Sequence, residues 1–267
     1  MNFKQVFKWG LLAVFILFFS GIIISLSPKF YNIVVIKDTM LFYLGAILFI
    51  GTSMYAFLFP EDIRFSKMDL PVVAFIFFTI VSFIFSSSKS YSFYYLAIFI
   101  SYFVIFFSAR IFLNEKKIFD VIYFLLILVA LLVTIYGIFL HFHIDILNFY
   151  DDPETIKRTP STMGNPNFFA GFLILTLFPA VSGVFYFRNI ILKVSSGFTS
   201  GLILYSILLT RTRAAFVGLL AGIIIFAGIF LYKILSDSKL KEDFRKLLKI
   251  FIPASLLLII LIFFIAP

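Results

Sequence analysis

The sequence contains no cysteine, so disulfide bonds and thiolate metal sites are excluded within it. It has only 2 histidines among 267 residues, His141 and His143, which are too few for a histidine-based metal cluster. We therefore expect no metal and no cofactor. The lack of cysteine does not by itself indicate a cellular compartment.

Charged residues are also scarce. They make up 13% of the chain, whereas hydrophobic residues make up 63% and the mean hydropathy is +1.13. A water-soluble domain of this length cannot bury that much apolar surface, so the composition favours a membrane protein. The net charge of +9 is typical of basic residues on cytoplasmic loops beside anionic lipid. We expect the lipid bilayer as a partner and no nucleic acid.

Long apolar runs fill most of the chain, and a helix needs about 20 such residues to cross a bilayer. We predict an all-α fold, a polytopic transmembrane helix bundle with about nine spans in a single domain over residues 1–267. The predicted spans are Trp9–Leu26, Met40–Phe59, Leu70–Ser86, Phe93–Leu113, Phe119–Leu140, Asn167–Phe187, Ile190–Leu209, Ala214–Leu235 and Leu248–Ala266. The first run is longer than that of a cleaved signal peptide, and no small-residue cleavage site follows it.

The basic residues indicate an orientation. With the N-terminus in the cytoplasm, basic residues on inside loops outnumber those on outside loops by about two to one, as the positive-inside rule requires. The longest outside loop is then 141–166. Small residues recur four residues apart at Gly197 and Gly201 on the seventh predicted span and at Ala214, Gly218 and Gly222 on the eighth, and they favour a close contact involving these two helices. The basic residues placed outside are Lys29, Lys37, Lys89, Lys157, Arg158, Arg211 and Arg213.

Two short stretches on this outer side stand out. The first runs from Lys157 to Gly171 and holds an arginine, a turn and the start of an apolar helix. Asn165 is a good helix cap, and Pro166 suits the first helical position, where no N–H is needed. The second stretch, Thr210 to Ala215, begins the eighth predicted span. We expect the two stretches to meet.

Three outside arginines, Arg158, Arg211 and Arg213, need a physical explanation. A helix N-terminus carries a partial positive charge, so Arg211 and Arg213 are unfavourable at the start of the eighth span unless an anion is bound there. Helix N-termini together with arginines make a site for phosphate or diphosphate. The alternative is that these side chains extend to lipid headgroups, and the residues alone do not decide between the two.

The other polar residues of the loop carry weaker signals. We expect Asp145, Asp151, Asp152 and Glu154 to form a solvated acidic loop, because their spacing matches no metal-binding loop. We expect His141 and His143 to lie at the membrane interface. Two residues apart on a helix, they point in different directions and do not form a shared catalytic pair.

The two stretches resemble motifs of the O-antigen ligase and O-antigen polymerase superfamily. Arg-x-x-x-x-x-Gly-Asn-Pro-Asn-Phe-Phe-Ala, from Arg158 to Ala170, is similar to its outer-loop motif. Leu-Leu-Thr-Arg-Thr-Arg-Ala-Ala-Phe-Val-Gly, from Leu208 to Gly218, is similar to its Leu-Thr-x-Ser-Arg-Gly-Ala-x-x-Gly segment. Thr212 stands where serine is common in the family, and Ala214 where glycine is common.

The resemblance implies a metal-independent membrane glycosyltransferase of the bacterial inner membrane with its site on the periplasmic face. Family members move a glycan from a polyprenyl diphosphate to lipid A–core, a polysaccharide or a protein. By this resemblance Arg158 and Arg213 bind the diphosphate. Arg211 is a further candidate without a clear family counterpart. The residues that shape the loop and the helix start are Gly164, Asn165, Pro166 and Asn167.

The chain departs from the family pattern in one respect. The family has about a dozen spans and a large periplasmic loop with a histidine base, whereas this sequence stops at Pro267. We therefore expect an N-terminal part that binds donor, with the catalytic base beyond Pro267. The motifs do not separate ligase from polymerase. The alternative hypotheses are an anion transporter and a non-catalytic membrane subunit.

Overall fold

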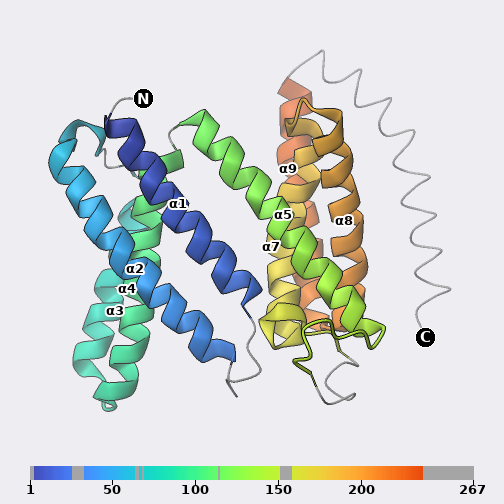
Figure 1. Ribbon diagram of the computed structural model, residues 1–267, viewed down its shortest axis with the longest axis horizontal. Helices are drawn as coiled ribbons and strands as arrows, with labels where there is room; N and C mark the ends of the chain where they lie inside the picture. The colour runs from blue at the N-terminus through green and yellow to red at the C-terminus, as the bar shows by residue number, and fades with distance from the viewer. Residues whose placement is uncertain are drawn as a thin grey trace. The chain divides into compact units, whose positions relative to one another are not determined.

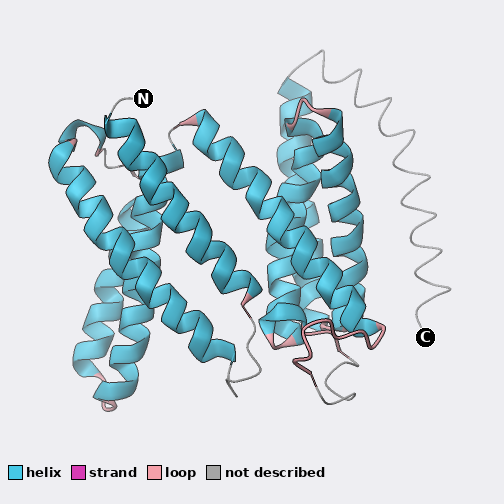
Figure 2. Ribbon diagram, viewed as in Figure 1, coloured by secondary structure: helices cyan, strands magenta, loops and turns pink. Residues whose placement is uncertain are grey.

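The computed structural model describes residues 3–25, 33–63, 66–67, 69–113, 115–150 and 158–236, and the described residues form α-helices and 3-10 turns joined by loops, with no strand (Figure 1, Figure 2). The all-α prediction is confirmed. The elements are α1 (Phe3–Ile24), α2 (Ile33–Leu58), η1 (Pro60–Asp62), α3 (Asp69–Phe85), α4 (Lys89–Leu113), α5 (Lys116–His141), η2 (Ser161–Met163), α7 (Pro166–Tyr186), α8 (Ile190–Thr210) and α9 (Arg213–Ser236).

The helices fall on the predicted spans. Among the described residues, 6 helices are long and apolar enough to cross a membrane, namely α1, α2, α4, α5, α7 and α8. They indicate a multi-pass membrane protein. The apolar helix α3 is shorter, with 17 residues. The ninth predicted span, Leu248–Ala266, lies outside the described residues, so the count of nine spans stays a prediction.

The chain forms two compact units, residues 1–212 and residues 213–267. In the first unit, contacts define two opposite ends of the helices. At the Lys4 end, Lys4 and Lys8 on α1 reach Asp62 of η1 and Glu115 before α5. At the Arg158 end, the loop between α5 and α7 meets the end of α1, where the Thr162 hydroxyl donates to the Ile23 carbonyl at 2.7 Å. The predicted alternation of helix direction therefore holds in this unit.

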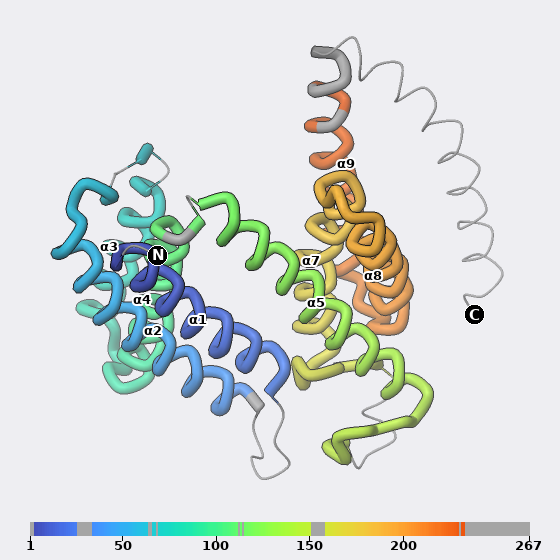
Figure 3. Tube along the Cα trace, turned by 45° about the horizontal axis from the view of Figure 1, so that its top comes forward, coloured from blue at the N-terminus to red at the C-terminus, as the bar shows by residue number. Residues whose placement is uncertain are grey.

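Two groups of helices build the packing of the first unit. In one group α2 packs against α1 and α4, around the buried side chains of Leu12, Leu44 and Tyr55. In the other, α7 packs along α8, and α5 contacts both (Figure 3). Helix α5 also contacts α1, so it connects the two groups. Every helix that positions the Arg158 end within this unit therefore packs against at least one neighbour.

The close contact of α8 is not where the glycine pattern predicted it. At Gly201 an added Cβ would meet no described atom within 4 Å, and at Gly197 it would meet only Val184 Cγ2, at 3.6 Å. The close approach is at Gly183 of α7, where an added Cβ would lie 2.7 Å from the Ser196 hydroxyl oxygen. The close contact between the two helices is therefore made by Gly183 of α7 and Ser196 of α8, not by the glycines of α8.

Candidate anion-binding site

The loop after α5 is organised by Asp145. Its carboxylate accepts hydrogen bonds from the Tyr136 hydroxyl at 2.8 Å and from the backbone N–H of Leu147, Phe149 and Tyr150, at 3.0, 2.6 and 2.7 Å. Burial acts to raise the pKa of Asp145, but these hydrogen bonds outweigh it and hold the pKa below its ordinary value of 3.8. Asp145 is therefore a structural anchor, and the prediction of a solvated acidic loop is wrong for this residue.

A second set of contacts fixes the segment before α7. Ser161 adopts the left-handed conformation with φ 50°, its hydroxyl donates to the Val133 carbonyl at 2.6 Å, and its own carbonyl accepts from Tyr150 at 2.7 Å. Burial and the nearby Asp145 carboxylate raise the pKa of Tyr150, so its hydroxyl stays a donor. Together with the Thr162 bond to α1, these contacts hold η2 against α5 and α1.

The helix start at Pro166 is as predicted. Asn165 lies in extended conformation as the N-cap, and its side chain accepts from the Asn167 N–H at 2.8 Å. Pro166 occupies the first helical position. Gly164 just before them has φ 72°, a left-handed conformation that glycine adopts at little cost. The sequence Gly164-Asn165-Pro166 thus sets the direction in which α7 leaves the loop.

Arg158 lies where this helix start meets the end of α8. Its Nε donates to the Thr210 carbonyl at 3.2 Å, and its Nη2 donates to the Asn167 side-chain oxygen at 3.1 Å and to the Thr212 hydroxyl at 3.2 Å. The Thr212 hydroxyl in turn donates to Asn167 at 3.3 Å. The prediction that the two stretches meet is confirmed for Arg158, Asn167, Thr210 and Thr212.

These contacts use neutral oxygen atoms on one edge of the guanidinium. Among the described residues, no carboxylate forms an ion pair with Arg158, and its Nη1 has no hydrogen-bond partner. Arginine has five N–H donors in a planar fork that matches phosphate oxygens. The side chain is exposed. A guanidinium with one fixed edge and the other edge open is suited to bind an anion.

The structure changes the interpretation of Arg211. It is not at the start of a helix, because it caps the C-terminus of α8 in left-handed conformation, with φ 49°. A cation is favourable at a helix C-terminus, so Arg211 does not by itself require a bound anion. Arg213 is the first residue of α9, as predicted for the eighth span, and its side chain is exposed. The argument from an unfavourable helix N-terminus therefore applies to Arg213 alone.

The remaining polar residues of the loop take different positions. His141 is the last residue of α5 and lies close enough to Arg211 for their charges to interact. His143 is exposed in a turn with φ 59°. Asp151, Asp152 and Glu154 lie outside the described residues. Residue patterns predicted Asn165 and Asn167 at the helix start. They did not predict that Tyr150 holds the loop by donating to the Ser161 carbonyl, because its position in the sequence indicated only a tyrosine at the membrane interface.

The chain was compared with protein-family models, with curated proteins and with solved structures, and no match was found. The interpretation of the site therefore rests on its geometry and on the motif resemblance.

Proposed function

We propose that this chain binds the glycan donor for a membrane glycosyltransferase reaction of the O-antigen ligase type. It would bind a polyprenyl-diphosphate-linked glycan at the Arg158 end, on the periplasmic face of the bacterial inner membrane. The observation that carries the proposal is the fixed guanidinium of Arg158, which has an open edge and no described carboxylate partner. A polyprenyl diphosphate supplies both a hydrocarbon chain for the bilayer and an anion for this edge.

In this proposal Arg158 stabilises the diphosphate leaving group. When the glycan departs, negative charge develops on the diphosphate, and a positioned cation lowers the energy of that state. The bonds to Thr210, Asn167 and Thr212 hold the guanidinium in place before the donor arrives, which reduces the ordering cost of binding. Arg213, which follows Thr212 directly in the sequence, is the proposed second diphosphate ligand. Arg211 is a third candidate.

A crosslinking experiment tests this function. The full chain is reconstituted with a radiolabelled donor that carries a photoreactive polyprenyl chain, and labelling is compared between the native protein, Arg158→Ala and Arg213→Ala. A charged hydrogen bond contributes about 1.5–3 kcal/mol, so we expect each variant to need roughly 10- to 100-fold more donor for half-maximal labelling.

The chain offers a matched control in Arg188, an exposed arginine that follows α7 at its opposite end. Arg188→Ala removes the same charge from the same protein and is expected to leave labelling unchanged. Native labelling in both Arg158→Ala and Arg213→Ala would contradict the proposal. Equal losses in all three variants would also contradict it, because they would indicate a general charge effect.

A further inference from the structure

A cleft of about 800 Å³ lies between α2, α3 and α4 at the Lys4 end, away from the Arg158 site. Its walls are mostly apolar and include Phe49, Ile76, Ile80, Phe103 and Phe107. Ligand sites in proteins commonly measure about 300–1,000 Å³. The cleft is therefore large enough for a ligand with a long hydrocarbon part.

The length of the cleft matches one leaflet of a membrane. On α4 its lining extends from Ile111 to Ile100, and a helix rises by about 1.5 Å per residue, so the cleft is roughly 16 Å long. The hydrocarbon core of a bilayer is about 30 Å thick, and half of that is one leaflet. Charged residues line only one end of this cleft. An amphiphile that stands upright in one leaflet has the same arrangement of polar and apolar parts.

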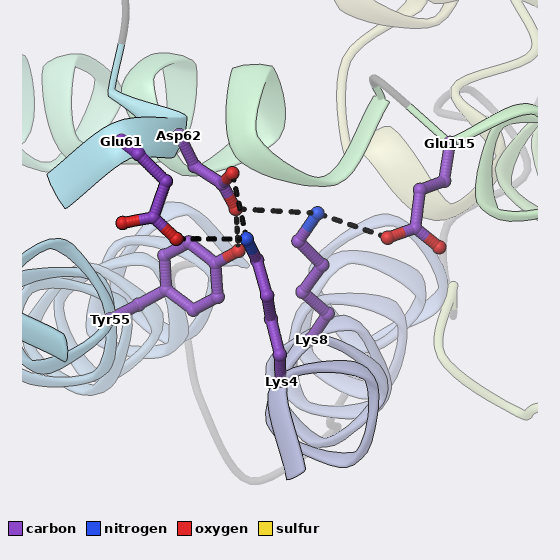
Figure 4. Close-up of polar contacts among 6 residues, drawn as sticks. All are labelled: Lys4, Lys8, Tyr55, Glu61, Asp62 and Glu115. Atoms are coloured by element: carbon purple, nitrogen blue, oxygen red, sulfur yellow. Dashed lines mark hydrogen bonds and ion pairs between the residues drawn. The ribbon is translucent and has the colours of Figure 1, made fainter. Parts of the chain in front are cut away.

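The polar end of the cleft combines both signs of charge. Lys8, Arg110, Glu61 and Asp62 line it. Behind this lining, Glu115 pairs with Lys8 and the buried Asp69 pairs with Arg110, so the four carboxylates of the cluster outnumber its three cations, the third of which is Lys4. Figure 4 shows Lys8 pointing between Asp62 and Glu115, with its Nζ 3.9 Å from Asp62 and 3.0 Å from Glu115. Basic residues at this end were predicted only as topology signals. The structure instead makes them part of an ionic cluster.

Contacts within the cluster keep the charges in place. Lys4 pairs with Glu61 at 3.2 Å and with Asp62 at 2.8 Å, and the Tyr55 hydroxyl donates to Asp62 (Figure 4). Burial acts to raise the pKa of Asp62, but Lys4, Tyr55 and Lys8 outweigh it and hold the pKa below its ordinary value. Asp62 is therefore a carboxylate at neutral pH, and a ligand meets both cations and anions here.

We propose that this cleft binds one phospholipid with a zwitterionic ethanolamine headgroup, one acyl chain lying between α2, α3 and α4. The headgroup ammonium has three N–H donors for the oxygens of Glu61 and Asp62. Its phosphate lies on the side of Lys8 and Arg110, which keep their ion pairs with Glu115 and Asp69. A choline headgroup has no N–H to donate. A purely anionic lipid is repelled by the two carboxylates. Polyprenyl diphosphate is disfavoured for the same reason, which separates this cleft from the Arg158 site.

The test uses the full chain in bilayer nanodiscs made from equal amounts of phosphatidylethanolamine and phosphatidylglycerol. The protein is released from the nanodiscs and its retained lipids are counted by native mass spectrometry. We expect one retained lipid per chain, with phosphatidylethanolamine preferred. Ala56→Trp places a large ring in the cleft and is expected to abolish retention. Met54→Trp is the control, because Met54 is an exposed residue of the same helix that lines neither this cleft nor the cavity beside it.

A second variant tests the headgroup without filling the cleft. Glu61→Gln keeps the shape of an exposed side chain and removes its charge. An exposed ion pair contributes up to about 1 kcal/mol, so we expect the preference for phosphatidylethanolamine to fall roughly two- to fivefold. Asp120→Asn, an acid on α5 that does not line the cleft, is expected to leave the preference unchanged.

Three results would overturn the proposal. They are no retained lipid in the native protein, equal retention of the two phospholipids, and an unchanged preference in Glu61→Gln. Because Glu61→Gln alters only an exposed group, its result decides the question even if Ala56→Trp fails to fold.

Discussion

At the scale of single residues, Arg158 depends on its neighbours for position. Three neutral oxygen atoms, from Thr210, Asn167 and Thr212, hold one edge of its guanidinium. Neutral partners fix the orientation of the cation without neutralising its charge, so its attraction for an anion is retained. A carboxylate in the same place would compete with the diphosphate.

The Thr212 hydroxyl offers a selective test of this positioning. Thr212→Val removes the hydroxyl and nearly keeps the shape, whereas Thr212→Ser keeps the hydroxyl. A single hydrogen bond contributes about 0.5–1.5 kcal/mol, so we expect Thr212→Val to weaken donor binding roughly two- to tenfold. Equilibrium binding of polyprenyl diphosphate in nanodiscs measures the effect. Thr212→Ser should bind like the native protein, and equal affinity in Thr212→Val would show that Arg158 needs no support from Thr212.

Asp145 gives a pH-dependent prediction. Its folded-state pKa lies below the ordinary value of 3.8, so its stabilisation of the loop is fully present above about pH 3.8 and is lost as the pH falls through the lower folded-state pKa. We expect Asp145→Asn to speed hydrogen exchange at the amides of Phe149 and Tyr150 at pH 7. The difference in exchange rate between Asp145→Asn and the native protein, measured at the same pH, should shrink below about pH 3.8. A difference that grows on acidification would contradict the assignment.

Local sequence rules predicted one part of the loop and missed another. The cap at Asn165 was predictable, because its partner N–H is only two residues away. The role of Asp145 was not, since the Tyr136 hydroxyl comes from the preceding helix and the other donors depend on how the backbone folds around the carboxylate. The contact between Arg158 and Thr210 spans 52 residues, and the sequence predicted only that their stretches lie on the same side and meet, not which atoms are in contact.

At the scale of elements, the contact between α7 and α8 determines where the Arg158 site can form, because the site joins the start of one helix to the end of the other. The helices themselves were predictable from their apolar length. Their contact faces were not, because nearly every residue around these helices is apolar or small and lipid is as apolar as leucine. The glycine spacing at Gly197 and Gly201 therefore did not identify the face that packs.

A pair of glycine substitutions tests which face is in contact. Gly183→Ala places a methyl group 2.7 Å from the Ser196 hydroxyl oxygen and 3.0 Å from Ile127 Cδ1, so these side chains or the helices that carry them must shift. Overpacking of this kind costs about 1–3 kcal/mol, and we expect a lower thermal unfolding midpoint in detergent. Gly201→Ala should leave the midpoint unchanged or raise it, because its Cβ meets no described atom within 4 Å. The reverse order would place the contact on the predicted glycine face.

At the scale of the whole molecule, the proposed function requires a defined orientation. The described helices of the first unit alternate in direction, and the positive-inside rule predicts that the Lys4 end lies in the cytoplasm. Since the chain has no cysteine, single cysteines can report each end. We expect Ser87→Cys, in the turn after α3, to react with an impermeant maleimide in intact spheroplasts. Ser66→Cys, before α3, should react only after permeabilisation, and the opposite pattern would contradict the orientation.

The central claim is that the Arg158 end binds a diphosphate on a polyprenyl chain. The most direct measurement is the equilibrium affinity of native protein and of Arg158→Gln for polyprenyl diphosphate and polyprenyl monophosphate in nanodiscs. We expect the native protein to prefer the diphosphate and Arg158→Gln to lose roughly 10- to 100-fold in diphosphate affinity, because a charged hydrogen bond is removed. Equal affinity of the native protein and Arg158→Gln for the diphosphate would contradict the claim.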